Sequence, residues 1–267
     1  MTISKGQAGL SIVELLVALV VSMLLMTGVV QVFLASKQTY ASNSAASRLQ
    51  ENGRFALEFI AQSARHAGYV EAANVTIDPI PRPIIPVASG STCDAGLCSS
   101  QGAGNASDSV SFSFQPRLLD GARRDCLGNT SINGSNIGDT DVIINRFFIA
   151  NEGTGTAALA CSSRNSSQNS SSTSNELVEG IDALQVQYGV GTTGNVSSYV
   201  SADRVNNWNN VLAIRIAVLA NSIEPVTPPP PADRQYVLLD AAPVTFADGK
   251  ARQVFTTTIK LRNIGEP

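Results

Sequence analysis

The chain has 267 residues, of which 43% are hydrophobic and 15% are charged, and its formal net charge is −3. This length suits one compact domain with an appendage, or two small domains. Because the chain is mildly acidic and no basic cluster exceeds the pair Arg123 and Arg124, its composition argues against nucleic acid as the main partner.

The N-terminal region contains an apolar run with one ionisable side chain. Between residues 10 and 34 the polar residues are Ser11, Glu14, Ser22, Thr27 and Gln31. A helix of this length spans about 37 Å, which is enough to cross a bilayer. Lys5 precedes the run and the next positive residue is Lys37, so the positive-inside rule favours a cytoplasmic N-terminus and an exported body.

The small residues Ala8 and Gly9 lie before the apolar run, whereas an ordinary secretory cleavage site follows it. Cleavage after Gly9 would leave the apolar helix on the mature protein, with a new amine at Leu10 and Glu14 as its fifth residue. The segment "GLSIVELLVALVVS" resembles the class III signal of type IV pilins and type II secretion pseudopilins, with Leu10 in place of the usual Phe. The resemblance implies that a membrane-embedded prepilin peptidase cuts after Gly9 and methylates Leu10.

Glu14 is expected to set the register of subunits in a filament. A carboxylate inside an apolar layer costs a few kcal/mol unless it finds a partner, and the dipole at the N-terminus of its own helix gives only partial relief. A better partner is the α-amine of the adjacent subunit. Only one axial stagger places each Glu14 opposite such an amine, so the ion pair would fix the register.

After residue 34 the pattern becomes amphipathic, with apolar residues at helical spacing: Leu49, Ala56, Phe59, Ile60, Ala64 and Ala67. Gly68 is a candidate C-cap, so we expect one helix from Leu10 to about Ala67. The segment "QENGRFALEFIAQSARHAGY" resembles the region after the transmembrane helix in minor pilins of the PilW type. For Glu51, Asn52, Gly53 and Arg54, no role follows from the sequence beyond positioning a head against this helix or forming a solvated helix face.

The rest of the chain is typical of β structure. The expected strands are 108–115, 140–150, 180–190, 211–220 and 254–263. Turns are expected at Asp120-Gly121, Asn133-Gly134 and Asp248-Gly249. Three segments indicate loops or linkers: the proline-containing segments 79–86 and 224–233, and the Ser-rich segment 162–175.

These patterns predict an α+β fold, and the resemblance implies that it is of the type IV pilin kind. A long N-terminal helix, transmembrane in its first half, would pack on an antiparallel sheet. The expected parts are a cleaved leader (1–9), a transmembrane and filament-core helix (10–34), its amphipathic continuation (35–68) and a β-rich head (69–267). The head carries an insert at about 90–175, to which the family resemblance does not extend.

The four cysteines, Cys93, Cys98, Cys126 and Cys161, are an even number in this loop-rich part of the chain. Four cysteines allow three pairings, of which we favour Cys93–Cys98 and Cys126–Cys161. The alternative is a zinc site with four thiolates, but it normally needs short paired knuckles that these spacings lack. Disulfides would imply an oxidising compartment.

Other candidate sites have simpler structural explanations. "GVGTTG" (189–194) matches a dinucleotide fingerprint but no helical pattern follows it, so a turn or loop is expected. The only histidine, His66, lies in the amphipathic helix, which favours a surface or interface role over a catalytic triad. Asp139 and Asp141 fit a turn better than a calcium loop. The aromatic residues Tyr188, Tyr199 and Trp208 suit either a core or a binding face.

We therefore expect a non-catalytic minor pilin without cofactor, metal or small-molecule substrate. The resemblance implies that it helps to initiate type IV pilus assembly and is incorporated at or near the pilus tip. Its implied partners are other minor pilins and the major pilin through the N-terminal helix, the prepilin peptidase and the inner-membrane assembly platform. It would sit in the bacterial inner membrane with its head in the periplasm, and later at the cell surface. The alternatives are a type II secretion pseudopilin, or a tip adhesin or DNA-uptake pilin that uses the insert.

Overall fold

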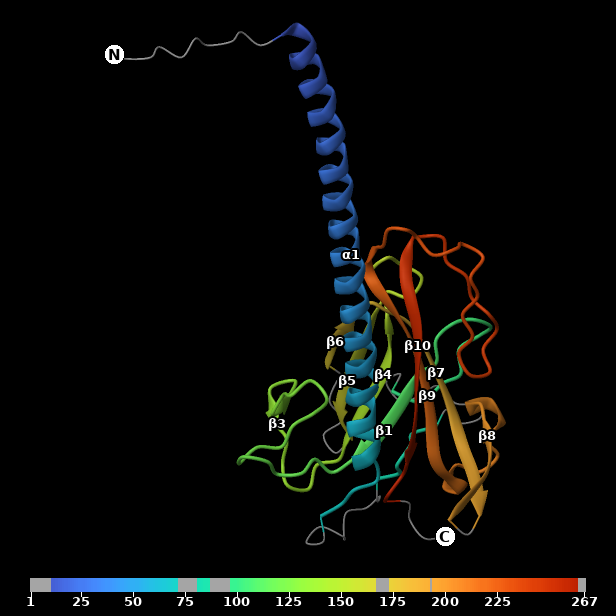
Figure 1. Cartoon of the computed structure of the whole chain (residues 1–267). Coiled ribbons are helices and arrows are strands. Elements are labelled where there is room, and N and C mark those ends of the chain that lie inside the picture. Colours follow the sequence, from blue (N-terminus) through green and yellow to red (C-terminus); the bar gives the residue numbers. More distant parts are fainter. Residues whose placement is uncertain (1–10, 72–80, 87–96, 167–172, 193, 264–267) are drawn as a thin grey trace. The chain divides into compact units, whose positions relative to one another are not determined.

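The computed structural model describes residues 11–71, 81–86, 97–166, 173–192 and 194–263. The chain divides into two compact units, residues 1–44 and residues 45–267. The described residues form the helix α1 (Ile12–His66) and the strands β1 (Val110–Phe114), β2 (Ser131–Ile132), β3 (Ser135–Asn136), β4 (Ile143–Ala150), β5 (Ala158–Asn165), β6 (Thr173–Glu179), β7 (Ile181–Thr192), β8 (Asn195–Val200), β9 (Val211–Pro225) and β10 (Lys250–Lys260); all except β2 are labelled in Figure 1. Two short 3-10 helices, Ala202–Arg204 and Trp208–Asn210, lie between β8 and β9.

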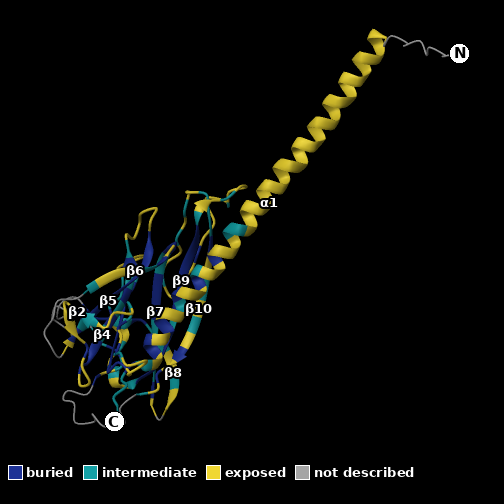
Figure 2. Cartoon of the chain, turned by 90° about the vertical axis from the view of Figure 1, so that its left-hand side faces the viewer, coloured by how far each residue is buried: buried dark blue, intermediate teal, exposed yellow. Residues whose placement is uncertain are grey.

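The expected long helix is confirmed as α1. It ends where predicted, because Gly68 adopts a positive φ of 73° and donates its backbone N–H to the Ser113 carbonyl at 2.8 Å. Within the second unit, α1 buries one stripe of residues three or four positions apart: Leu49, Gly53, Ala56, Ile60 and Ala64. Figure 2 shows this buried stripe.

The head contains two four-stranded antiparallel sheets. Their strand orders are β1-β4-β5-β6 and β10-β9-β7-β8. Side chains from both sheets join the buried stripe of α1 in one core; examples are Phe112 and Phe147 of the first sheet and Ile214 and Ile216 of the second. All five predicted strands are present, as β1, β4, β7, β9 and β10.

Strand β9 is buried on both faces. Alternate residues such as Ile214, Ile216 and Val218 join the core that contains α1. The residues between them, Ala217 and Leu219, contact a second cluster formed by Tyr236 and Leu238. Tyr236 and Leu238 belong to the connection between β9 and β10 (residues 226–249). This connection therefore covers the outer face of the sheet. The prediction that residues 224–233 form a linker is wrong at its start, because β9 extends to Pro225.

A buried arginine fixes this cover to the sheet. The Arg252 side chain is 3% exposed and pairs with Asp182 of β7 and with Asp248 of the covering connection, each at 2.6 Å. Its guanidinium lies 3.7 Å from the ring centroid of Phe246. Another buried polar residue, Asp108, joins the two sheets: beside β1, it accepts the backbone N–H groups of Gly102 and Val186 at 2.8 Å.

The turns form at the Asp-Gly and Asn-Gly pairs where the sequence predicts them. Asp120 and Gly121 both have positive φ and close a short bridge between Leu119 and Ala122. Asn133 and Gly134 do the same between β2 and β3, as the tight two-residue turn of a hairpin requires. Gly249 also has positive φ, just before β10.

Two loop predictions are wrong in part. Strand β7 continues through the "GVGTTG" segment to Thr192. A Cβ on Gly189 would lie 3.0 Å from the Tyr199 ring of β8, so this glycine permits close strand approach. The Ser-rich segment also contributes strand residues, because β5 reaches Asn165 and β6 begins at Thr173. Residues 167–172 lie outside the described part of the chain.

Candidate functional site

The apolar part of α1 presents hydrophobic side chains to its surroundings. Every residue from 11 to 43 is exposed within the chain (Figure 2), and this part of the helix is long and apolar enough to cross a membrane. Its Ser22 and Thr27 hydroxyls donate to the backbone carbonyls of Ala18 and Met23 at 2.7 and 2.8 Å. These two polar side chains therefore need no partner outside the helix.

Glu14 differs from these polar neighbours. It lies in the first turn of α1 and is exposed, and its carboxylate has no hydrogen bond or ion pair with any described residue. A carboxylate in this position can pair with a positive group brought by another chain. The predicted cleavage and methylation positions, Gly9 and Leu10, lie outside the described residues and remain predictions, as does the role of Glu14 in register.

The "ENGRF" segment lies where α1 meets the head. The Gly53 position faces β10, and a Cβ built there would overlap the ring of Phe255, lying 2.8 Å from its Cγ and closer to two other ring atoms. The neighbouring Asn52 donates its side-chain N–H to the Glu179 carbonyl at the end of β6, at 3.1 Å. Helix α1 is thereby held to one strand of each sheet. Asn52 and Gly53 position the head, whereas Glu51 and Arg54 are exposed.

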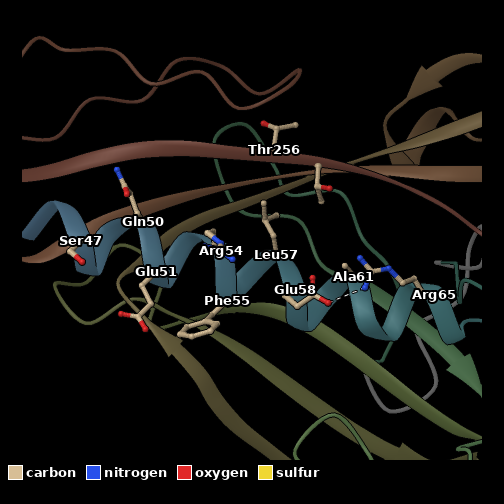
Figure 3. A pocket seen from close by; sticks show the side chains of 11 residues that line it. Ser47, Gln50, Glu51, Arg54, Phe55, Leu57, Glu58, Ala61, Arg65 and Thr256 are labelled. Carbon is tan, nitrogen blue, oxygen red and sulfur yellow. Dashed lines mark hydrogen bonds and ion pairs between the residues drawn. The ribbon is translucent and has the colours of Figure 1, made fainter.

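Beside this junction, a groove of about 730 Å³ runs between α1 and β10. Figure 3 shows its helix side, where Gln50, Arg54 and Leu57 lie along α1 below Thr256 of β10. Glu58 and Arg65 form an exposed ion pair at 2.9 Å on the same helix. The groove is mixed in polarity and carries no concentration of catalytic groups.

One predicted disulfide is confirmed. Cys126 and Cys161 are bonded and lie 35 residues apart in the sequence, so the bond fixes the loop after β1 to the buried strand β5. Cys98 is also disulfide-bonded, and its predicted partner Cys93 lies outside the described residues. These bonds exclude the four-thiolate zinc site. Within the described residues no cluster of three or more His, Cys, Asp or Glu side chains could hold a metal ion.

The remaining candidates have structural roles. His66 is half-buried and its ring lies 6.1 Å from that of Phe114. Asp139 pairs with the buried Arg123 at 3.1 Å. Asp141 accepts the Gly138 backbone N–H at 2.8 Å and the Asn165 side-chain N–H at 2.7 Å. These bonds support the turn interpretation.

The three aromatic residues divide between core and surface. Tyr188 is 1% exposed and Trp208 contacts it edge-on, with ring centroids 4.8 Å apart. Tyr199 lies on β8, where the Arg215 guanidinium is 3.9 Å from its ring centroid. Tyr188 is therefore a core residue, and Arg215 covers one face of Tyr199.

Two protein-family models match the chain. Residues 146–263 match type IV pilus-assembly protein W, and residues 4–30 match the prokaryotic N-terminal methylation motif. Among solved structures, a type IV-like pilin from Thermus thermophilus is similar, with 16% sequence identity, a TM-score of 0.44, and coverage of 82% of this chain and 100% of that chain. No curated protein sequence matches.

Proposed function

We propose that this chain, a type IV minor pilin of the PilW type with a role in pilus assembly, joins other minor pilins in the membrane complex that starts a fibre. It would then remain at or near the fibre tip. The observation that carries this proposal is the helix from Ile12 onward, whose apolar side chains are exposed and which holds one carboxylate in its first turn.

The helix would serve two environments in turn. Apolar side chains exposed over several turns are stable in a bilayer, and equally in the apolar core of a helical bundle. Glu14 would lie about four residues, or roughly 6 Å, from the amine of the processed chain. Pairing with the amine of an adjacent subunit removes the desolvation cost of the carboxylate at one stagger only, which makes assembly selective for that register.

The head would select the neighbouring subunits. The "ENGRF" junction supports this role, because contacts to both sheets fix the head on α1. A head that is fixed on the part of α1 within residues 45–66 presents the same surface beside that part of the helix in every subunit. Non-catalytic action agrees with the roles found for His66, Asp139 and Asp141.

The test uses the full chain as the only copy in cells. Glu14→Ala should leave the amount of membrane-inserted protein unchanged and strongly reduce surface piliation. Ser22→Ala is the matched control, because its hydroxyl is already satisfied within the helix. Normal piliation with Glu14→Ala would overturn the register mechanism.

Processing gives a separate test. Gly9→Leu should block cleavage, which is seen as a band that does not shift on a denaturing gel. Cleavage of this variant would contradict the assignment of Gly9. If piliation is normal without the protein but secretion through a type II system fails, the pseudopilin alternative replaces the pilus role.

A further inference from the structure

A pocket of about 510 Å³ at the C-terminal end of α1 is positively charged. Arg65 and His66 enter it from the last turn of the helix, Arg117 from the segment after β1, and Arg262 from the segment after β10. Three parts of the chain that are far apart in sequence thus bring arginines to one place. A cluster of positive charge is unexpected in a chain whose net charge is −3.

The pocket's own carboxylate does not balance these charges. Glu58 is the acidic residue in its lining, and it already pairs with Arg65 at 2.9 Å. Arg117 stacks over the ring of Tyr69 at 5.0 Å, which holds its guanidinium in place and leaves its N–H edges free to donate. Arg117 and Arg262 are both exposed.

The arginines of this pocket also act on His66. Burial, followed by the charges of Arg117, Arg262 and Arg65, lowers the pKa of His66 below its ordinary value of 6.5. The imidazole is therefore neutral at pH 7, which limits the repulsion inside the pocket. An anion bound between the arginines would relieve that repulsion further.

A largely apolar groove of about 450 Å³, whose lining also includes Arg124 and Asp125, adjoins the charged pocket and shares Gln62, His66 and Arg117 with it. Phe59 of α1, Leu119 of the following loop and Leu177 of β6 line this groove. Leu119 is 61% exposed and Phe59 is 38% exposed. Apolar side chains that are open to solvent beside a cluster of arginines form a surface with two distinct halves.

We propose that this surface, the arginine pocket together with the adjoining apolar groove, binds a segment of a neighbouring protein subunit that carries Asp or Glu beside apolar side chains. The carboxylates would accept hydrogen bonds from Arg117 and Arg262, and the apolar side chains would cover Phe59 and Leu119. This proposal rests on the proposed function, for which it supplies the contact by which the head selects a neighbour.

A protein segment fits this surface better than a nucleic acid does. Nucleic-acid sites extend positive charge along a strand of phosphates. Here the charged pocket continues into an apolar groove lined by Phe59, Leu119 and Leu177. Guanidinium groups also match carboxylates with two parallel hydrogen bonds, and apolar contacts beside such a pair provide the buried area that a peptide contact needs.

Binding to the full chain in detergent tests the proposal. The probe is a fluorescein-labelled amphipathic peptide of Leu and Glu, compared with the same peptide carrying Gln in place of Glu, and binding is measured by fluorescence anisotropy. Arg117→Glu and Arg262→Glu should each weaken binding of the acidic peptide about tenfold, while Leu119→Asp should weaken both peptides. Arg204→Glu, at an exposed arginine elsewhere on the head, is the matched control and should have no effect.

Several results would overturn the proposal. If Arg204→Glu weakened binding of the acidic peptide as much as Arg117→Glu does, the attraction would be non-specific. If the Gln peptide bound as tightly as the Glu peptide, the carboxylates would have no role. Tighter binding of a labelled single-stranded oligonucleotide would make this a phosphate site. Self-association of the purified chain that disappears in Arg117→Glu would assign the surface to a second copy. Because the four substituted residues are exposed, unchanged circular dichroism and melting temperature should accompany each variant.

Cells distinguish failure of this proposal from failure of the proposed function. As the only copy, the doubly reversed variant Arg117→Glu/Arg262→Glu should reduce piliation at an unchanged protein level. If it assembles normally while Glu14→Ala does not, only the contact proposed here is wrong. If Glu14→Ala assembles normally, the proposed function fails whatever the peptide measurements show.

Discussion

Gly53 allows the sharpest test of how α1 is held to the head. In an exposed helix, replacing Gly by Ala stabilises the protein by about 1 kcal/mol, because Ala loses less backbone freedom on folding. At position 53 the added Cβ would overlap the Phe255 ring on β10. Overpacking of this kind costs about 1–3 kcal/mol, and the gain in helix propensity offsets about 1 kcal/mol of that cost, so Gly53→Ala should lower the free energy of unfolding by up to about 2 kcal/mol.

The sign of this effect should depend on Phe255. In a Phe255→Ala background the overlap is gone and only the helix propensity remains, so Gly53→Ala should raise the free energy of unfolding by about 1 kcal/mol. The assay is urea unfolding of the detergent-solubilised chain, followed by the fluorescence of Trp208, the only tryptophan. Because Trp208 packs against the buried Tyr188, its emission reports on the head.

Gly28 provides the matched control, since it lies in the same helix and a Cβ there would meet nothing within 4 Å. Gly28→Ala should leave the unfolding midpoint of the head unchanged. Stabilisation by Gly53→Ala in the otherwise unchanged protein would refute the reasoning. The same refutation would follow if Gly53→Ala had equal effects with and without the Phe255 ring.

Three further predictions concern the interior of the head, each measured by urea unfolding. Burial raises the pKa of Asp108 from 3.8 to about 6, so its ionisation opposes folding: stability should fall by about 2 kcal/mol between pH 4 and pH 7 relative to Asp108→Asn. Parallel pH profiles of the two proteins would contradict this. Replacing Cys126 and Cys161 by Ala together should cost about 3–4 kcal/mol, from the entropy of a 35-residue loop, and a loss below about 1 kcal/mol would be inconsistent with it. Arg252→Met should lower the free energy of unfolding by about 3–5 kcal/mol, because it leaves the buried Asp182 carboxylate without its ion-pair partner. Adding Asp182→Asn should recover part of that loss. If it recovers nothing, the ion pair does not stabilise the head.

The sequence predicts the elements of this fold that depend on local chemistry. Apolar periodicity and Gly68 define α1 and its end. The Asp120-Gly121 and Asn133-Gly134 pairs indicate turns because these residue types accept the positive φ that a tight turn requires. In the structure, both residues of each pair have a positive φ. The strands with alternating or continuous apolar residues are likewise visible. These features depend on residues that are close together in the chain, so they can be recognised from the sequence alone.

Strands β5, β6 and β8 were not predicted, because their polar residues are explained only by what they pack against. Ser162 and Ser163 of β5 are buried opposite Ser174 and Thr173 of β6, and a serine-rich pattern alone resembles a flexible segment. Gly189 belongs to a strand because Tyr199 of the next strand approaches it closely. Such contacts form only when the chain has folded.

The candidate site shows the same division. Glu14 is conspicuous in the sequence because a lone carboxylate in an apolar run is rare, and its chemistry can be reasoned without a structure. Gly53 could not be interpreted in this way, since its role depends on Phe255, about 200 residues further along the chain. The arginine pocket was missed for the same reason, because Arg65, Arg117 and Arg262 come together only in the folded head.

The two kinds of contact proposed here would act at different stages. A Glu14–amine pair would depend only on the methylation motif at residues 4–30, so it would fix the stagger without distinguishing one neighbour from another. The arginine pocket lies in the head and is built from residues on both sides of the α1 junction, so it can distinguish neighbours only if that junction is rigid. Loosening the junction with Phe255→Ala should therefore lower piliation less than Glu14→Ala does. It should also weaken binding of the acidic peptide less than Arg117→Glu does. All of the arginines of the pocket would still be present, and only the packing of α1 against the head would become looser.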